Sequence, residues 1–241
     1  MNPLLDRVLA AFILVATAPL LAAAAAAIRL EGPGPVLYRQ RRVGRDGQPF
    51  ELIKLRTMVS GAEWIGAGIV VDEGDPRITR VGAMLRRLSL DELPNLINVV
   101  RGEMALVGPR PTVQAQVDRY TERQRRRLEV RPGLTGWAQI HGRAALPWHE
   151  RIELDVWYVD HRSLALDLRV LAMTAGVLIS GRGLYRGETG GWRPPAESGG
   201  DRSGGRTGER DGGRADDDPG APSERRRRRR RNSRGGAPSA R

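Results

Sequence analysis

The chain has 241 residues, a length that suits one domain of about 150–200 residues with attached segments. It contains no cysteine, which excludes disulfides, zinc–thiolate sites and thiol nucleophiles. With three histidines in all, the sequence does not favour a histidine-based metal site. The net charge of +12 predicts an anionic partner, such as a phosphate ligand, an acidic lipid surface or nucleic acid. Arginine supplies nearly all of this charge, but a GC-rich genome would produce the same bias.

An uncharged apolar run of about 21 residues, Val8–Ile28, opens the chain. Its length matches the roughly 20 residues that a helix needs to cross a bilayer. Three interpretations stay open from the residues alone: a signal peptide cleaved after the alanines 22–27, a spanning helix kinked at Pro19, or a helical hairpin that re-enters on the same side. Basic residues soon after the run place the following domain in the cytoplasm; they are Arg39, Arg41, Arg42 and Arg45.

The segment from 31 to 186 mixes short apolar runs, turn signals and amphipathic stretches. Val36–Tyr38 and Phe50–Leu55 read as strands, and Asp46-Gly47 between them is a hairpin-turn signal. Apolar periodicity then predicts four helices, over Ile78–Leu88, Leu93–Val100, Thr112–Val130 and Leu164–Ile179. The uncharged part of the last helix is too short to span a bilayer, which favours a core or interfacial helix. The expected class is α+β, mostly helical.

The final segment, 187–241, consists mainly of Gly, Arg, Pro, Ser and Asp and ends near the arginine block Arg225–Arg231. Because it has too few large apolar side chains to offset the entropy of ordering, it is predicted to be a disordered tail. The expected organisation is therefore a membrane segment over 1–30, a catalytic or binding domain over 31–186, and the tail.

The strongest chemical signal is the segment Ser89–Asn95, in which Asp91 and Glu92 stand together ahead of an apolar helical run. One interpretation is purely structural, because Ser-x-x-Glu is a capping box and acids are favoured in a first helical turn. The position of Pro94 argues for a helix that starts nearer Asp91. In the functional interpretation, the helix N-terminus keeps Asp91 ionised, as a carboxylate nucleophile requires.

Three further patterns carry weaker signals. Val107–Pro111 fixes Arg110 between two prolines, either for a ligand or merely in a rigid turn. A glycine-punctuated loop, from Arg131 to Arg143, resembles loops whose backbone approaches phosphate closely. The acids Asp72, Glu73 and Asp75 are compatible with a metal site, but a plain surface loop explains them as well.

Together these segments resemble one family, the bacterial sugar transferases, or monotopic polyprenyl-phosphate phosphoglycosyl transferases of the undecaprenyl-phosphate sugar phosphotransferase type. The resemblance extends from about Asp6 to Gly183. Its motifs, in order, are Gly34–Val36, Arg39–Gly44, Lys54–Met58, Asp75–Thr79, Ser89–Pro94, Leu106–Pro111, Arg131–Gln139 and Asp155–Val159.

The resemblance implies a two-step transfer with Asp91 as the nucleophile. Asp91 would attack the sugar-linked phosphate of a UDP-sugar and release UMP, and polyprenyl phosphate would then take the phosphosugar from the enzyme. Glu92, with Asp91, would hold Mg²⁺. The matching phosphate-binding candidates are Arg86, Arg110 and Arg143, with Lys54, Arg56 and Arg131 as weaker ones.

The resemblance also favours the re-entrant hairpin, broken at Pro19, with both ends on the cytoplasmic face of the bacterial inner membrane. The chain departs from the family pattern at three positions, Ala18, His141 and Ala144. Since the residue before the proline is commonly Ser, any hydrogen bond that relieves the kink must come from a residue other than Ala18. The other two changes concern contacts with the sugar or nucleotide.

Two rival functions remain at this stage. A basic nucleic-acid-binding protein would use the Arg/Gly-rich tail, although the scarce aromatic residues and the apolar run argue against it, and no specific nucleic acid is expected. A catalytically inactive membrane scaffold would keep the fold without needing Asp91. A homo-oligomer is compatible with either the enzyme or the scaffold.

Overall fold

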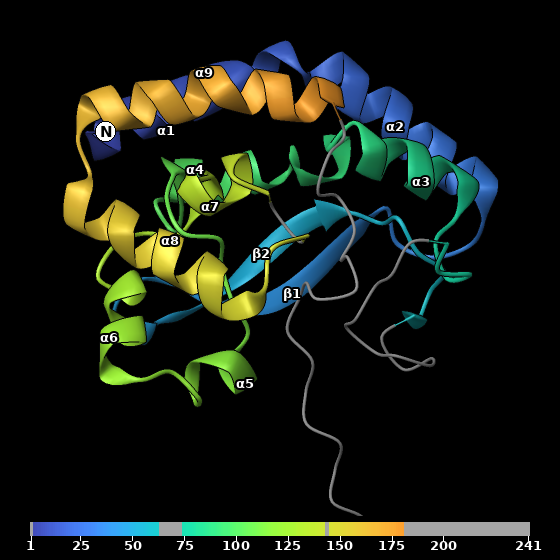
Figure 1. Ribbon diagram of the computed structural model, residues 1–241. Coiled ribbons are helices and arrows are strands. Elements are labelled where there is room, and N and C mark those ends of the chain that lie inside the picture. The colour runs from blue at the N-terminus through green and yellow to red at the C-terminus, as the bar shows by residue number, and fades with distance from the viewer. Residues whose placement is uncertain (1, 63–73, 143–144, 181–241) are drawn as a thin grey trace, which may run out of the picture. The chain divides into compact units, whose positions relative to one another are not determined.

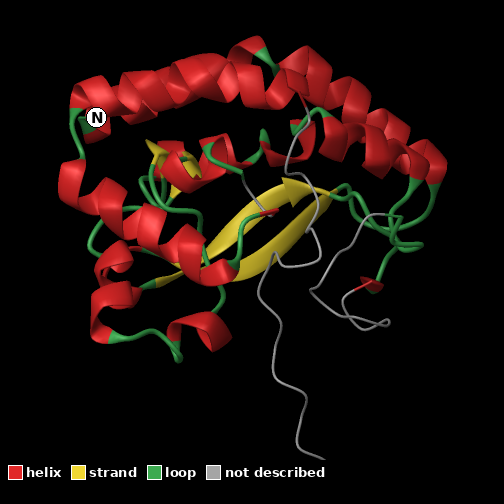
Figure 2. Cartoon of the chain, in the orientation of Figure 1, coloured by secondary structure: helices red, strands yellow, loops and turns green. Residues whose placement is uncertain are grey.

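The computed structural model describes residues 2–62, 74–142 and 145–180, which all lie in the first of two units, Met1–Ala196. The acids Asp72 and Glu73, the residues Arg143 and Ala144, and the predicted tail lie outside the described residues. The described part is mostly helical with two small sheets, so the predicted α+β class is confirmed (Figures 1 and 2). Its helices are α1 (Pro3–Ala16), α2 (Ala18–Glu31), α3 (Arg80–Arg87), α4 (Asn95–Arg101), α5 (Gln114–Val117), α6 (Glu122–Arg125), α7 (Trp137–Ile140), α8 (Trp148–His161) and α9 (Leu164–Ser180).

The apolar run forms two helices, α1 and α2, that meet at a bend of 59°. In the described residues no single helix is both long and apolar enough to cross a bilayer, whereas this bent pair taken together has the necessary length and composition. Pro19 lies in the first turn of α2, where its missing N–H costs no intrahelical bond, and the break falls at Thr17, two residues before the predicted proline.

Thr17 supplies the hydrogen bond that Ala18 lacks. Its hydroxyl donates to the carbonyl oxygen of Ile13 at 2.7 Å and also lies 3.3 Å from that of Leu14. The Ile13 carbonyl also accepts the backbone N–H of Thr17 at 2.9 Å, so the hydroxyl is a second donor there. Its longer contact reaches the Leu14 carbonyl at the helix end, where an unpaired carbonyl is costly in an apolar surrounding. The hydroxyl at the break therefore comes from Thr17, two residues before Pro19, and not from the residue immediately before the proline, where the family pattern has Ser.

The predicted hairpin is present as strands β1 (Leu37–Val43) and β2 (Pro49–Leu55), paired antiparallel from Leu37↔Leu55 to Val43↔Pro49. The first strand is longer than the predicted Val36–Tyr38. Between the strands, Asp46 and Gly47 both adopt positive φ, 54° and 77°, as the Asp-Gly signal predicted. Alternation along the hairpin puts Leu52 in the core and leaves Arg39 and Arg41 exposed.

A second sheet, absent from the sequence prediction, pairs β3 (Ala105–Val107) with β4 (Gly133–Thr135) in parallel. Glycines make the approach possible: a Cβ at Gly133 would lie 2.1 Å from the nitrogen of Gly108, and one at Gly136 would lie 2.1 Å from its carbonyl oxygen. Any larger side chain would push the two backbones apart. The glycine-rich segment 131–137 thus packs backbone against backbone beside the turn that carries Arg110.

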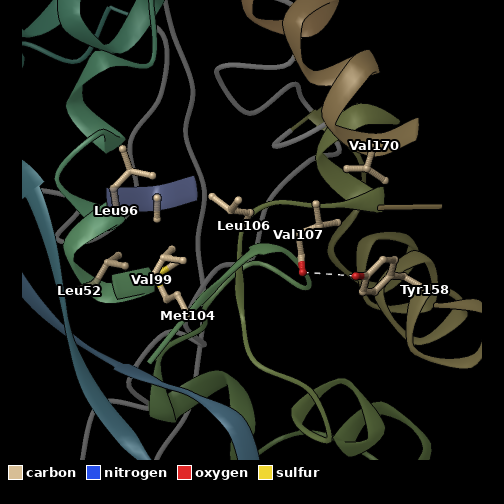
Figure 3. Packing of buried hydrophobic residues seen from close by; sticks show 9 residues of the cluster. Leu52, Leu96, Val99, Met104, Leu106, Val107, Tyr158 and Val170 are labelled. Carbon is tan, nitrogen blue, oxygen red and sulfur yellow. Dashed lines mark hydrogen bonds between the residues drawn. The ribbon is translucent and has the colours of Figure 1, made fainter. Parts of the chain in front are cut away.

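The main core lies where these elements meet (Figure 3). Leu96 and Val99 of α4, Val170 of α9 and Leu52 of β2 are almost fully buried in it, together with Ala10 of α1. Figure 3 also shows the Tyr158 hydroxyl donating to the carbonyl oxygen of Val107, at 3.3 Å, which ties α8 to β3. Because α1 contributes to this core, the N-terminal helix pair is fixed to the domain that follows it.

The predicted helices near α3, α4 and α9 are confirmed, but the one over Thr112–Val130 is wrong. That segment contains the short α5 and α6 and a 3₁₀ turn, Arg126–Leu128. The chain breaks after the buried Tyr120, because Thr121 starts a new helix through a capping box with Gln124. Its arginines do not all face outward, since Arg127 is buried. The sequence prediction also missed α8, whose apolar residues were noted only as a motif.

Candidate active site

Asp91 and Glu92 lie on a tight turn between α3 and α4. Ser89 adopts a positive φ of 54°, a 3₁₀ turn follows over Leu90–Glu92, and α4 begins only at Asn95, after Pro94. The Ser89 side chain does not cap this turn, so the capping-box interpretation of the motif is wrong. The turn instead holds Asp91 largely buried, at 9% exposure, and directs Glu92 toward two cations.

Glu92 is bound by side chains from two distant parts of the sequence. The Lys54 ammonium, on β2, donates to Glu92 Oε1 at 2.7 Å, and Arg110 Nη2 donates to the same oxygen at 2.6 Å. Arg110 Nη1 lies 3.4 Å from Oε2. Lys54 and Glu92 are mostly buried, at 17% and 20% side-chain exposure, whereas Arg110 is 47% exposed. Arg110 is therefore the cation that a ligand from solvent would meet first.

These charges set the protonation of the two acids in opposite directions. Burial alone would raise the pKa of Glu92, but Arg110 and Lys54 outweigh it and hold that pKa well below the usual range. For Asp91 burial dominates and raises the pKa, and the negative charge of Glu92 adds to this, against the opposing charges of Lys54, Arg86 and Arg110. Lys54, Arg86 and Arg110 favour the ionised form of Asp91, but they do not outweigh burial, so the pKa of Asp91 is raised rather than kept low by a helix N-terminus as the sequence had suggested.

Two more cations complete the cluster. Arg86, near the end of α3, lies with Nη1 3.5 Å from the Thr57 hydroxyl, and its charge acts on Asp91. Arg42, on β1, lines the same small cavity as Lys54, Glu92 and Arg110. The sequence analysis did not select Arg42 as a site residue. The signal was available in the hairpin, because strand alternation and the register put Arg42 on the face that carries Lys54.

A buried network holds the Arg110 turn from behind. Arg127 donates from Nη2 to the backbone carbonyl of Arg110 at 2.9 Å and to the Asp155 carboxylate, and from Nη1 to the Tyr120 hydroxyl. Arg127 and Asp155 are only 7% and 3% exposed. Desolvation lowers the pKa of Arg127, but Asp155 and Tyr120 more than compensate, so the pKa is raised and the guanidinium stays charged. The backbone that carries Arg110 is therefore fixed before any ligand arrives.

The remaining predicted site residues lie elsewhere. Arg56 binds the carbonyl oxygens of Ile28, Gly32 and Pro33, at the end of α2. In the described part of the chain no hydrogen bond or ion pair joins Arg131 to Asp91 or Glu92. Asp75 forms an ion pair with Arg77, and no group of three or more metal-binding side chains occurs among the described residues.

Comparisons with known proteins identify a family for this chain. They agree with the arrangement of two adjacent carboxylates among lysine and arginine side chains, in a domain joined to a bent apolar helix pair. The family described as "Bacterial sugar transferase" matches residues 1–181. The chain belongs to the bacterial sugar transferase family. It is 44% identical over 183 residues to the uncharacterized sugar transferase EpsL of Bacillus subtilis, covering 76% of this chain and 89% of that protein.

Two further bacterial sugar transferase relatives have more specific names. A UDP-glucose:undecaprenyl-phosphate glucose-1-phosphate transferase of Caulobacter vibrioides is 44% identical over 190 residues, covering 75% of this chain and 70% of that protein. The exopolysaccharide production protein ExoY of Sinorhizobium fredii is 37% identical over 196 residues, covering 75% and 86%. The membership of the family that the sequence motifs indicated is thereby confirmed, and with it the prediction that the chain is a transferase.

The buried pair behind Arg110 should contribute strongly to the stability of this sugar transferase. Arg127→Met leaves Asp155 buried without its partner, and we expect a loss of about 3–5 kcal/mol in the free energy of unfolding. The matched control is Arg123→Met, which removes an exposed ion pair with Glu153 and should cost at most about 1 kcal/mol. Denaturant unfolding followed by tryptophan fluorescence measures both, and equal small losses would contradict the role assigned to Arg127.

Proposed function

We propose that this protein transfers a sugar 1-phosphate from a UDP-sugar to undecaprenyl phosphate and so starts the membrane stage of exopolysaccharide, capsule or glycoconjugate synthesis. The observation that carries the proposal is the Asp91–Glu92 pair, in which Glu92 is bound by Lys54 and Arg110 while Asp91 is left beside them. The named activity of the Caulobacter vibrioides relative supports the choice of donor and acceptor.

In the first step, a carboxylate oxygen of Asp91 attacks the phosphorus that bears the sugar. A bond forms between this oxygen and phosphorus, and the bond from phosphorus to the oxygen of UMP breaks, so that UMP leaves with the electron pair. The product is an aspartyl phosphosugar. No proton has to move, because the attacking carboxylate and the departing phosphate are both anions.

In the second step, a phosphate oxygen of undecaprenyl phosphate attacks the same phosphorus. The bond from phosphorus to Asp91 breaks, which regenerates the carboxylate and yields the lipid diphosphate-sugar. A mechanism that divides the transfer in this way predicts ping-pong kinetics. The other strong requirement is electrostatic, because two anions must approach each other in each step.

Glu92 and its cations meet this requirement. Since Lys54 and Arg110 are held by Glu92, their positive charge is placed beside Asp91 without the cost of ordering two long side chains when substrate binds. Arg86 adds a third charge that acts on Asp91. The same charges favour ionised Asp91, which burial alone would tend to protonate.

Mg²⁺ fits the donor set of this site. Mg²⁺ commonly uses one or two carboxylates together with substrate phosphates, and Asp91 and Glu92 supply the carboxylates. Asn95 lines the same cavity as Glu92, and its buried side-chain oxygen, which has no hydrogen-bond partner in the part of the chain that is described, would be a further oxygen donor. When bound there, Mg²⁺ would neutralise charge on the phosphate oxygens.

We also propose that α1 and α2 enter the cytoplasmic face of the inner membrane as a re-entrant hairpin. Large apolar side chains on α1 are exposed, among them Leu4, Val8, Phe12 and Val15. An exposed apolar surface of this kind indicates contact with lipid or protein. A membrane position would bring the head group of the lipid acceptor next to the catalytic carboxylates.

Substitution Asp91→Asn should abolish catalysis, because an amide cannot form the acyl phosphate. We expect UMP release from UDP-sugars to fall by on the order of 10³-fold or more, with no phosphosugar attached to the protein. The assay measures UMP release by purified protein with a panel of UDP-sugars, Mg²⁺ and undecaprenyl phosphate. Asp118→Asn, at an exposed aspartate of the same domain, is the control. Equal release by the wild type and the Asp91 variant would refute the role of Asp91 as nucleophile. If neither the wild type nor either variant released UMP, a scaffold role would be supported.

Removal of divalent cations should stop the reaction without unfolding the protein. We expect UMP release to cease in excess EDTA and to return when Mg²⁺ is added beyond the chelator, because Lys54, Arg86 and Arg110 must offset the charge of the two carboxylates as well as that of the diphosphate. The unfolding temperature, measured in parallel, should change little. Undiminished release in EDTA would contradict the proposed metal requirement.

The re-entrant topology can be tested with single cysteines, since the natural chain has none. Asn2→Cys reports the start of α1, and Arg45→Cys, in the exposed hairpin turn, reports the side of the catalytic domain. Both should react with a membrane-impermeant maleimide in inside-out vesicles and neither in right-side-out vesicles. Labelling of the two positions from opposite sides would show a spanning arrangement instead.

A further inference from the structure

We propose that Arg42 is a second phosphate-binding residue of the site, which acts with Arg110 on the phosphate that lies opposite Asp91. This inference rests on the function proposed above and adds to it a ligand for one particular phosphate. It is carried by the geometry of the hairpin, the hydrogen bonds of the guanidinium and the balance of charge around Glu92.

The Arg42 guanidinium is held in place by uncharged groups only. Its Nε and Nη2 donate to Gln40 Oε1 at 3.0 and 2.6 Å, and its Nη1 lies 3.4 Å from the carbonyl oxygen of Pro111. Among the described residues these bonds take up three of its five N–H groups, and no carboxylate forms an ion pair with it. The Nε–Nη2 edge of the guanidinium is thus anchored to Gln40, and one N–H group on each of Nη1 and Nη2 remains as a donor.

This orientation is specific to one face of β1. Arg42 and Gln40 are half-buried and share the face of Lys54, whereas Arg39 and Arg41 alternate onto the exposed face. Arg39 there pairs with Glu51 at 3.0 Å. The exposed arginines have the environment of ordinary surface charges, while Arg42 lines the cavity that also contains Lys54, Glu92 and Arg110.

The cavity carries more positive charge than its own acids neutralise. Glu92 already serves two cations, Lys54 and Arg110, so that Arg42 adds an uncompensated charge. Holding this charge in the cavity is unfavourable, and the pKa of Arg42 reflects it: burial first, and then repulsion from Arg110, lower this pKa to about 10. Keeping a guanidinium desolvated beside another one is unfavourable in the empty protein, and an anion placed between the two would reverse the sign of this interaction.

Reaction geometry identifies the anion. In phosphoryl transfer the attacking and leaving oxygens lie roughly in line, so UMP departs from the side opposite Asp91. In the second step the acceptor must attack from the side opposite the bond to Asp91, which is the position that UMP has vacated. A single phosphate position therefore serves both steps, and its ligand is in each case a phosphate monoester, first on UMP and then on undecaprenyl phosphate.

Arg42 can reach such a position with Arg110, since both line the cavity beside Glu92 and the charges of the two guanidinium groups act on each other. Each group offers a planar fork suited to phosphate oxygens. Lys54, in contrast, is committed to Glu92 and is mostly buried. The division of roles is thus that Lys54 holds the carboxylate, Arg110 bridges carboxylate and ligand, and Arg42 is reserved for the ligand.

The test compares Arg42→Gln with Arg41→Gln, its exposed neighbour on the same strand, in the full-length protein with UDP-sugar and Mg²⁺. Three quantities are measured: kcat/KM for the donor, from the dependence of single-turnover UMP release without acceptor on UDP-sugar concentration; inhibition by added UMP; and the KM for undecaprenyl phosphate. Loss of a charge-assisted pair of hydrogen bonds should reduce kcat/KM for the donor by about 10- to 100-fold and weaken UMP inhibition by a similar factor. Arg41→Gln should stay within about twofold of wild type. Arg42→Lys, which keeps the charge but not the fork, should lie between them.

The two steps separate the two sources of the phosphate. Losses in both steps support the shared position, a loss only in UMP release and UMP inhibition assigns Arg42 to the nucleotide, and a loss only in the acceptor KM assigns it to the lipid. The inference is overturned if Arg42→Gln behaves like Arg41→Gln, or if it loses activity with unchanged UMP inhibition and acceptor KM. The proposed function fails separately, when the wild type releases no UMP from any donor.

Discussion

The carboxylate of Glu92 is the point at which three separate pieces of the chain are joined. It binds Lys54 from the hairpin and Arg110 from the turn after β3, while it belongs itself to the turn between α3 and α4. Without this acid, the mostly buried Lys54 and the half-exposed Arg110 would repel each other beside Asp91, and without the cations the carboxylate would be buried unpaired. The charges of Glu92, Lys54 and Arg110 therefore join the three segments, and they lie beside Asp91, the proposed nucleophile.

Such a triad works only if the backbones beneath it are fixed, and two devices provide this. Arg127 binds the carbonyl of Arg110, so that the arginine turn is fastened to the buried Asp155 of α8. The glycines of the β3–β4 region let Gly133 and Gly136 pack directly against the backbone at Gly108. A preorganised site of this kind loses little entropy when it binds substrate, which is the advantage of placing charge in advance of the reaction.

The sequence predicted the elements whose signals are local. The Asp-Gly turn, the break at Pro19 and the helix around α9 follow from residues that are neighbours in the chain. The failures have a common physical cause, which is that tertiary contacts decided the outcome. The segment predicted as one long helix, Thr112–Val130, is interrupted near Tyr120, whose side chain is buried in the core. The parallel pairing of β3 with β4 depends on backbone contacts that no local pattern encodes. At the site, motif membership selected Asp91 and its neighbour, while Arg42 required the register of the hairpin to be known.

Arg56 links the end of α2 to the strand that carries Lys54. Its guanidinium binds carbonyl oxygens at the end of α2, Ile28 and Gly32 among them, and it stands two residues beyond Lys54, a separation of about 7 Å along an extended chain. If α2 sets the depth of the protein in the bilayer, this short rigid link sets the height of the charged cluster above the lipid. An acceptor would then be selected by where its phosphate sits rather than by its hydrocarbon chain, so that polyprenyl phosphates of different length should be used almost equally.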